Sequence, residues 1–193
     1  MANDLYIALV HYPVVNKEGR VVTTSVTNFD LHDLSRTGAT FGVKRVFIVT
    51  PVEVQRNMVT YIRDYWREGV GAIYNPDRKE AMGGLLATPD LVQTRLTIKE
   101  LSGIEPLLVG TTAKRQENSL SYGGLRAQMQ SKKRPFLLVF GTGHGLTADL
   151  LESCDAVLAP IDGAGAYNHL PVRSAVAIIL DRLVSHGSVT EQQ

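Results

Sequence analysis

The segment FLLVFGTGHGL, residues 136–146, decides the fold class. Its first five residues are all apolar, as in a parallel-sheet strand that helices cover on both faces. Three alternate glycines follow directly, Gly141, Gly143 and Gly145, and a simple turn does not need three of them. Glycine lets a ligand approach the backbone closely, and ligands of open α/β sheets bind beyond the carboxyl ends of the strands. The segment therefore predicts a buried strand that ends at a ligand site.

Apolar runs of this kind alternate with helical patterns along the chain, which indicates an α/β protein with a mainly parallel sheet and helices on both faces. The other predicted strands are Leu5–Val10, Arg45–Val49, Pro106–Val109 and Ala156–Leu158, with Leu91–Leu96 as a weaker sixth member of the sheet. Apolar residues at spacings of three and four predict the helices Asp30–Phe41, Val52–Arg67, Lys79–Leu86, Ile98–Leu101, Gly124–Ser131, Thr147–Leu151 and Val172–Val184.

Three local predictions add to this pattern. Tyr12–Ser25 is expected to form an extended loop or hairpin that turns at Asn16–Gly19. Gly42 is expected to end the first helix, and Asn28 is a candidate for its N-cap. In the helix Val52–Arg67 the buried stripe is expected to consist of Val54, Met58, Ile62 and Tyr65.

Length and composition favour a single domain spanning residues 1–193. Hydrophobic residues make up 44% and charged residues 20%, which argues against disorder and fibrous repeats. Lys+Arg number 20 against 19 Asp+Glu, so any nucleic acid must be bound by local patches. The only cysteine, Cys154, excludes an internal disulfide and fits a small buried hydrophobe. No signal peptide and no apolar run of about 20 residues is present, so we expect a cytoplasmic protein without membrane contact.

Two more loops follow predicted strands and could hold a ligand. Val109, Gly110 and Thr111 lead into Thr112-Ala113, where small residues leave room close to the backbone. Ala159–Pro171 is a long irregular loop before the last helix, which Pro171 suits as a first-turn residue. The glycines at 141–145 alone would also fit a dinucleotide site, but position 146 is Leu where that fingerprint requires Gly. A structural turn without a ligand is the remaining alternative.

Taken together, these segments resemble the SPOUT superfamily of S-adenosylmethionine-dependent RNA methyltransferases. Asn28, followed eight residues later by Arg36 and then by Phe41-Gly42, resembles the first motif of that family. Val139–Leu146, a strand ending in Gly-x-x-x-Gly-Leu, resembles the second. The third is matched by Ala159-Pro160-Ile161 together with Leu170–Ile178, a segment that opens an Ala-rich helix.

The resemblance implies a C-terminal trefoil knot, a homodimer, S-adenosylmethionine as cofactor and methyl transfer to a nucleotide of tRNA or rRNA. Arg36 would orient or activate the acceptor nucleotide from the partner subunit, with Asn28 beside it and Asp33, or Asp30, as general base. Backbone amides of the glycine loop and of the segment before the last helix would surround the cofactor. The implied cofactor-binding residues are Val109, Gly110, Thr111, Gly141, Thr142, Gly143, His144, Gly145, Pro160, Ile161, Tyr167, Asn168, Leu170 and Val172.

Departures from the family pattern keep other interpretations open. The ribose-methylating branch has other side chains where this chain has His144, Pro171 and Arg173, so a ribose acceptor is not assigned. His144 and Arg173 could contact phosphate or the methionine carboxylate. The alternative function is a SPOUT-like RNA-binding or regulatory protein that has lost catalysis.

Other chemistries lack support in the sequence. The histidines form no pair at metal-ligand spacing, and no hydrolase nucleophile motif occurs, so no metal is expected. RNA phosphates could instead meet the basic clusters, and a flipped base could stack on Tyr12, Tyr122 or Tyr167. The clusters are Lys44-Arg45, Arg78-Lys79, Lys114-Arg115 and Lys132-Lys133-Arg134.

Overall fold

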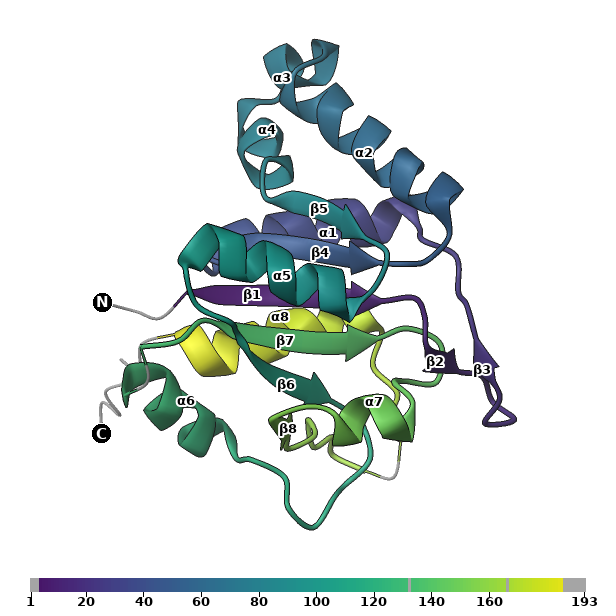
Figure 1. Ribbon diagram of the computed structural model, residues 1–193, viewed down its shortest axis with the longest axis vertical. Helices are drawn as coiled ribbons and strands as arrows, with labels where there is room; N and C mark the ends of the chain where they lie inside the picture. The colour runs from purple at the N-terminus through teal and green to yellow at the C-terminus, as the bar shows by residue number, and fades with distance from the viewer. Residues whose placement is uncertain (1–3, 132, 166, 186–193) are drawn as a thin grey trace.

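The computed structural model describes residues 4–131, 133–165 and 167–185, so Lys132 of the last basic cluster lies outside the described residues. Within them, a six-stranded sheet has the order β5-β4-β1-β7-β6-β8 (Figure 1). Every neighbouring pair is parallel, which confirms the expected class. The strands are β1 Leu5–Val10, β4 Arg45–Val49, β5 Leu85–Thr88, β6 Leu107–Thr111, β7 Phe136–Gly141 and β8 Ala156–Leu158.

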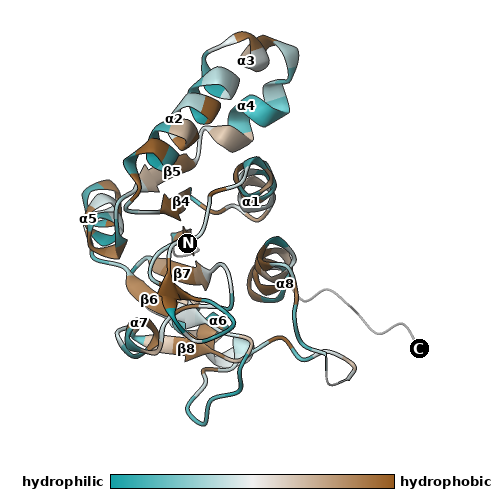
Figure 2. Cartoon of the chain, turned by 90° about the vertical axis from the view of Figure 1, so that its right-hand side faces the viewer, coloured by the Kyte–Doolittle hydropathy of each residue, from teal (hydrophilic) through white to brown (hydrophobic). Residues whose placement is uncertain are grey.

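Helices cover both faces of the sheet, as Figure 2 shows. They are α1 Asn28–Thr40, α2 Glu53–Arg67, α3 Val70–Tyr74, α4 Pro76–Met82, α5 Leu91–Ser102, α6 Tyr122–Ser131, α7 Ala148–Glu152 and α8 Val172–Val184. Alternate residues of β1 point to opposite faces, so Ile7 joins one buried cluster with α1, α6 and α8, and Ala8 joins another with α5 and α7. None of the described helices is long and apolar enough to cross a membrane.

The crossovers place a crevice at the carboxyl ends of the central strands. The helix after β6, α6, packs on the same face as α8, whereas the helix after β7, α7, packs on the opposite face. The loops that leave these neighbouring strands therefore diverge. Such a divergence is where open α/β sheets bind ligands.

The start of α1 is fixed by a capping box, but the N-cap is Thr27 and the expected N-cap Asn28 is wrong. The Thr27 hydroxyl accepts a hydrogen bond from the Asp30 amide at 3.2 Å, and the Asp30 carboxylate accepts one from the Thr27 backbone amide at 3.3 Å. Two backbone donors at the start of the helix are thereby satisfied. At the other end Gly42, with φ +69°, leaves the helix as expected.

The weakest strand prediction is wrong, because Leu91–Leu96 begins α5. Asp90 caps this helix by accepting from the Gln93 amide at 2.7 Å, and Gly103 ends it at φ +77°. The sixth strand is instead β5, whose first two residues fell at the end of the predicted helix Lys79–Leu86. In the structure α4 ends before Gly83-Gly84, which separates helix from strand.

The predicted buried stripe of α2 is also partly wrong. Val54 is 77% and Tyr65 45% exposed, while Val59 is the buried residue of the helix. Met58 and Ile62 pack partly against the core as expected. Val54 and Tyr65 therefore belong to the surface of the protein and not to its core.

The expected hairpin is confirmed and packs on the glycine loop. Its strands are β2 Val14–Val15 and β3 Val21–Val22, and the Asn16 side chain accepts from two amides of the turn. The His144 amide donates to the Val15 carbonyl at 2.9 Å, and the Val15 amide donates to the Gly145 carbonyl at 3.0 Å. The hairpin thus fixes the loop that follows β7.

Candidate functional site

A cavity of about 880 Å³ lies at the carboxyl ends of β6, β7 and β8. The loops after these strands and the segment that enters α8 form its walls. Most of the residues implied as cofactor contacts line it: Thr111, Gly141, Thr142, Gly143, His144, Gly145, Pro160, Ile161, Asn168, Leu170 and Val172. Segments separated by up to some sixty residues of sequence are thus brought to one place, although their contact with a cofactor stays a prediction.

Three of the implied residues do not line the cavity. Val109 is 2% exposed in the middle of the sheet. Gly110 faces α7, since a Cβ there would lie 2.9 Å from Leu151 Cδ2 and 3.1 Å from Cys154 Sγ. Tyr167 is 79% exposed and stacks edge-on against His169. The hairpin also forms a wall of the cavity, which was not predicted from the sequence. The lining residues that it contributes are Val15, Asn16, Lys17 and Gly19. The sequence signal was the position of the hairpin directly after the central strand.

The glycine loop is a tight structure in its own right. A Cβ on Gly141 would lie 2.6 Å from the Leu146 nitrogen, and Gly143 and Gly145 adopt φ of +62° and +109°. The expectation that its amides surround a cofactor is in part wrong, because the Thr142 and Gly145 amides donate to carbonyls of the protein. The loop is therefore a preformed wall of the cavity.

Free backbone groups come from the other side of the cavity. The main chains of Ile161 and Leu170 make no hydrogen bond to any residue that the structure describes. The Asn168 side-chain amide donates to the Ala113 carbonyl at 3.0 Å and joins the loop after β8 to the loop after β6. These segments offer a ligand both donors and acceptors.

A partly buried chain of hydrogen bonds connects the glycine loop to His11 at the end of β1. The Thr142 hydroxyl donates to the Val10 carbonyl at 3.0 Å and also bonds the Thr24 hydroxyl. Thr24 in turn lies 2.9 Å from Nδ1 of His11, which is 0% exposed. Since the Thr142 proton is used on Val10, Thr24 donates to Thr142 and the His11 Nδ1–H donates to Thr24. Burial lowers the pKa of His11 to about 4, with Asp30 opposing the shift.

Stability should fall in acid because of His11. Its folded pKa of about 4 lies below the ordinary value of 6.5, so between these pH values the unfolded chain binds a proton that the folded protein does not. The free energy of unfolding is therefore highest above pH 6.5 and should decrease by roughly 3 kcal/mol as the pH falls through this window. Urea denaturation at a series of pH values measures it. The variant His11→Gln should show a shallower slope, and an equal slope would contradict the assignment.

The residues predicted to be catalytic lie on α1 and not at the cavity. Arg36 is exposed and forms no ion pair with the described residues. Asn28 is exposed at the start of the helix. Asp33 pairs with Arg173 of α8 at 3.4 Å, and the same guanidinium lies 4.0 Å from Asp30. Arg173 thus ties α8 to α1 and does not line the cavity, while the catalytic roles stay predictions.

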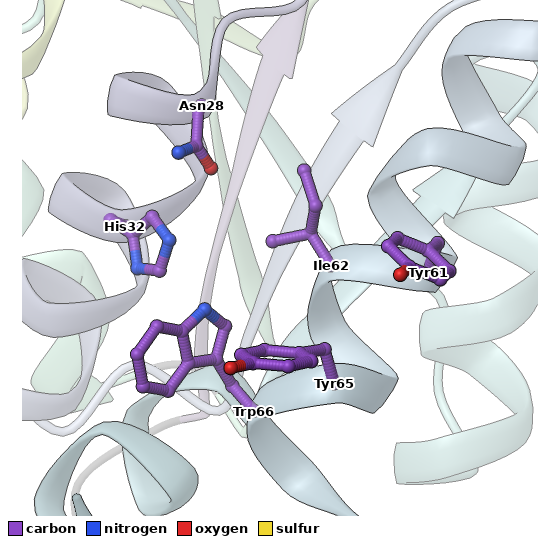
Figure 3. A pocket seen from close by; sticks show the side chains of 6 residues that line it. All are labelled: Asn28, His32, Tyr61, Ile62, Tyr65 and Trp66. Atoms are coloured by element: carbon purple, nitrogen blue, oxygen red, sulfur yellow. The ribbon is translucent and has the colours of Figure 1, made fainter. Parts of the chain in front are cut away.

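A second, smaller pocket of about 300 Å³ lies between α1 and α2 (Figure 3). Asn28 and His32 line it from α1, and the α2 side chains that line it are Tyr61, Ile62, Tyr65 and Trp66. The sequence signal was the cluster of three aromatic residues within six positions, in a chain with 7% aromatic residues. The spacing of Tyr65 predicts a buried residue of the helix, so the sequence does not indicate this pocket.

Other chemistries find little support at these sites. Burial raises the pKa of the Cys154 thiol to about 11, so it is protonated at neutral pH and a poor nucleophile. Among the residues that the structure describes, no three His, Cys, Asp or Glu side chains are grouped to hold a metal ion. Of the basic clusters, Lys114 lines the cavity, whereas Arg115 pairs with Asp162 at 2.6 Å.

Comparison with known sequences agrees with the resemblance drawn from the motifs. A family model described as "SAM-dependent RNA methyltransferase" matches residues 4–185. A tRNA (guanine-N(1)-)-methyltransferase of Nitratidesulfovibrio vulgaris is 45% identical over 181 residues, which are 94% of this chain and 42% of that protein. An uncharacterized protein of Aquifex aeolicus is 42% identical over 184 residues, 95% of this chain and 90% of that protein.

Solved structures show the same fold. The SpoU methyltransferase AviRb from Streptomyces viridochromogenes, in complex with AdoMet, has a TM-score of 0.56 at 14% identity, over 95% of this chain and 58% of that one. The TrmH/SpoU tRNA modifying enzyme of A. aeolicus has a TM-score of 0.55 at 17% identity, over 94% and 74%. These likenesses concern the fold alone.

Proposed function

Since the chain belongs to the family of SAM-dependent RNA methyltransferases, which the match over residues 4–185 establishes, we propose that it transfers a methyl group from S-adenosylmethionine to a nucleotide of tRNA or rRNA. The observation that carries the proposal is the cavity at the carboxyl ends of β6, β7 and β8, where the family's second and third motifs meet. This membership replaces the dinucleotide interpretation of the glycine loop.

The residues present fit the cofactor. The cavity of about 880 Å³ has the size of a small-molecule site. Phe140, Ile161 and Ile179 provide apolar walls for a flat ring, and the free backbone at Ile161 and Leu170 can bond its edge. When bound, S-adenosylmethionine supplies a methyl group on a positively charged sulfur. The chain's own contribution is to orient the ligand and keep water out.

The nucleotide and the methylated atom are not taken from the relatives. The chain spans 42% of the length of the two curated tRNA (guanine-N(1)-)-methyltransferases that it matches. Their name describes proteins more than twice as long, and the activity it describes can belong to the remaining part. We therefore propose the substrate class, tRNA or rRNA, without guanine N1 as the acceptor.

We also propose a homodimer, which the positions of the two motifs support. Arg36 and Asn28 lie on α1, away from the cavity lining of their own chain, so an active site that uses them needs a second copy. A trefoil knot is supported by β8, which pairs with β6 on one side and with the Leu120 segment on the other, so the chain after residue 111 wraps around it. A single domain and a cytoplasmic location stay predictions from the sequence.

Isothermal titration calorimetry with S-adenosylmethionine and S-adenosylhomocysteine tests the first half of the proposal. Binding of both, one ligand per chain, is the expected result. Transfer of a labelled methyl group to total RNA, followed by mass spectrometry of the nucleosides, tests the second. Absence of binding contradicts the proposed function, and binding without transfer to any RNA favours the catalytically inactive alternative.

A further inference from the structure

We infer that the pocket between α1 and α2 binds an unpaired nucleobase of the RNA substrate, an inference that rests on the proposed function and names the acceptor side of the same reaction. The pocket shares no lining residue with the cofactor cavity. It is therefore separate from that cavity, and a base bound there would occupy a second site. Its shape, side chains and surrounding charge each point to a base.

The aromatic wall suits a flat ring. Tyr61 and Tyr65 are 73% and 45% exposed and line one pocket together with Trp66, so their rings are accessible to a ligand. Trp66 is held edge-on by the Tyr65 ring at 5.3 Å and by the His32 ring at 5.5 Å. Figure 3 shows the Tyr61, Tyr65 and Trp66 side chains coming from α2, with the His32 ring facing Trp66 from α1. Bases stack on such rings regardless of sequence, since every base has a π face.

The opposite wall offers neutral hydrogen-bonding groups. Asn28 carries an amide, which can both donate and accept. Nδ1 of His32 is buried and has no hydrogen-bond partner among the residues that the structure describes. Burial, with Arg78 next in importance, lowers the pKa of His32, so its ring is neutral near pH 7. A neutral wall of donors and acceptors matches the edge of a base better than it matches a phosphate.

Positive charge surrounds the pocket without lining it. Asn28, His32 and Arg36 are spaced by four residues, so they form one row along α1, with Arg36 beyond the pocket. On the far side the Arg78 guanidinium lies 4.6 Å from the centre of the Trp66 ring. These cations are placed to meet the phosphates on either side of an inserted base. The row also explains how Asn28 and Arg36 can act on one nucleotide.

Trp66 makes the inference directly measurable, because it is the only tryptophan of the chain. Its fluorescence therefore reports on the pocket alone. Titration with a single-stranded RNA 12-mer of mixed sequence should quench this emission, after correction for absorbance by the RNA. Parallel anisotropy with the same oligonucleotide, fluorescently labelled, gives the affinity.

Substitutions separate stacking from other causes. Tyr65→Ala should weaken the affinity for the 12-mer by about 10-fold, the loss of one stacked base, and Tyr65→Phe should keep it. Tyr74→Ala is the matched control, since Tyr74 is an 82% exposed tyrosine of the neighbouring α3 that does not line the pocket. Calorimetry should show unchanged S-adenosylmethionine binding in all three variants.

Three outcomes would overturn the inference. RNA that binds and is methylated without changing the Trp66 emission places the base elsewhere. Equal effects of Tyr65→Ala and Tyr74→Ala exclude a specific stacking role. A change in oligomeric mass by light scattering in Tyr61→Ala assigns the pocket to an interface between copies. If the wild-type protein does not bind S-adenosylmethionine, the proposed function itself is contradicted. Failure of the base-binding inference and failure of the proposed function are therefore distinguishable.

Discussion

Arg36→Ala is expected to lower the rate of methyl transfer by about 100-fold, the usual cost of removing a charge placed to stabilise a transition state. Arg36 is exposed and forms no ion pair with the described residues, so its charge is available to the acceptor nucleotide. The affinity for S-adenosylmethionine should not change, because Arg36 does not line the cavity. Single-turnover methylation of RNA and calorimetry with the cofactor measure the two effects.

The fold should tolerate this substitution, since exposed positions usually change the free energy of unfolding by less than about 0.5 kcal/mol. Arg36→Lys keeps the charge but loses the planar guanidinium, and should show an intermediate rate. Arg126→Ala, at an exposed arginine of α6, is the control and should transfer methyl groups at the wild-type rate. A wild-type rate for Arg36→Ala would remove Arg36 from the active site.

Gly141→Ala should weaken S-adenosylmethionine binding by at least about 10-fold, or 1.4 kcal/mol. The new Cβ would lie 2.6 Å from the Leu146 nitrogen and 2.9 Å from the Gly145 carbon. Both are backbone atoms, so the loop that walls the cavity has to move. The free energy of unfolding should also fall, because overpacking typically costs about 1–3 kcal/mol. Calorimetry and chemical denaturation measure the two consequences.

Gly123→Ala is the matched control, because a Cβ at Gly123 meets no atom within 4 Å. Should Gly141→Ala fail to fold, Gly145→Ala gives a milder test, since its Cβ also meets open space and only the φ of +109° is strained. Unchanged cofactor affinity in a folded Gly141→Ala or Gly145→Ala protein would show that this loop does not shape the binding site.

The central strands could be predicted from the sequence because their burial on both faces leaves continuous apolar runs. The predicted β1, β4 and β8 agree with the structure at both ends. The β5 and α5 region could not be predicted in this way. Leu91–Leu96 contains β-branched residues, which are typical of strands, but Asp90 caps the segment as the start of a helix. The proposed knot depends on which segment passes outside β8, and local sequence patterns hold no information about threading.

The position of the cavity at the carboxyl ends of β6, β7 and β8 was predictable for a physical reason. Parallel strands share one edge, so residues after each strand must meet there, as Thr111, Gly141 and Ile161 do. The aromatic pocket could not be predicted, because it depends on where α1 and α2 lie relative to each other in the fold. Tyr65 has the spacing of a buried residue of α2, yet in the structure it is 45% exposed and lines the pocket.

Arg173 connects the first turn of α8, beside the cavity, to α1, which carries part of the second pocket. Its guanidinium pairs with Asp30 and Asp33 on α1, and the neighbouring Val172 lines the cofactor cavity. A ligand that shifts this turn of α8 would change the free energy of those ion pairs. It would thereby also change how strongly the first turn of α1, which carries Asn28, is held in place. By thermodynamic reciprocity, the factor by which the methyl donor alters the affinity for RNA equals the factor by which RNA alters the affinity for the donor. We therefore expect the coupling between the two proposed ligands to be a single free energy, which substitution of Arg173 would change.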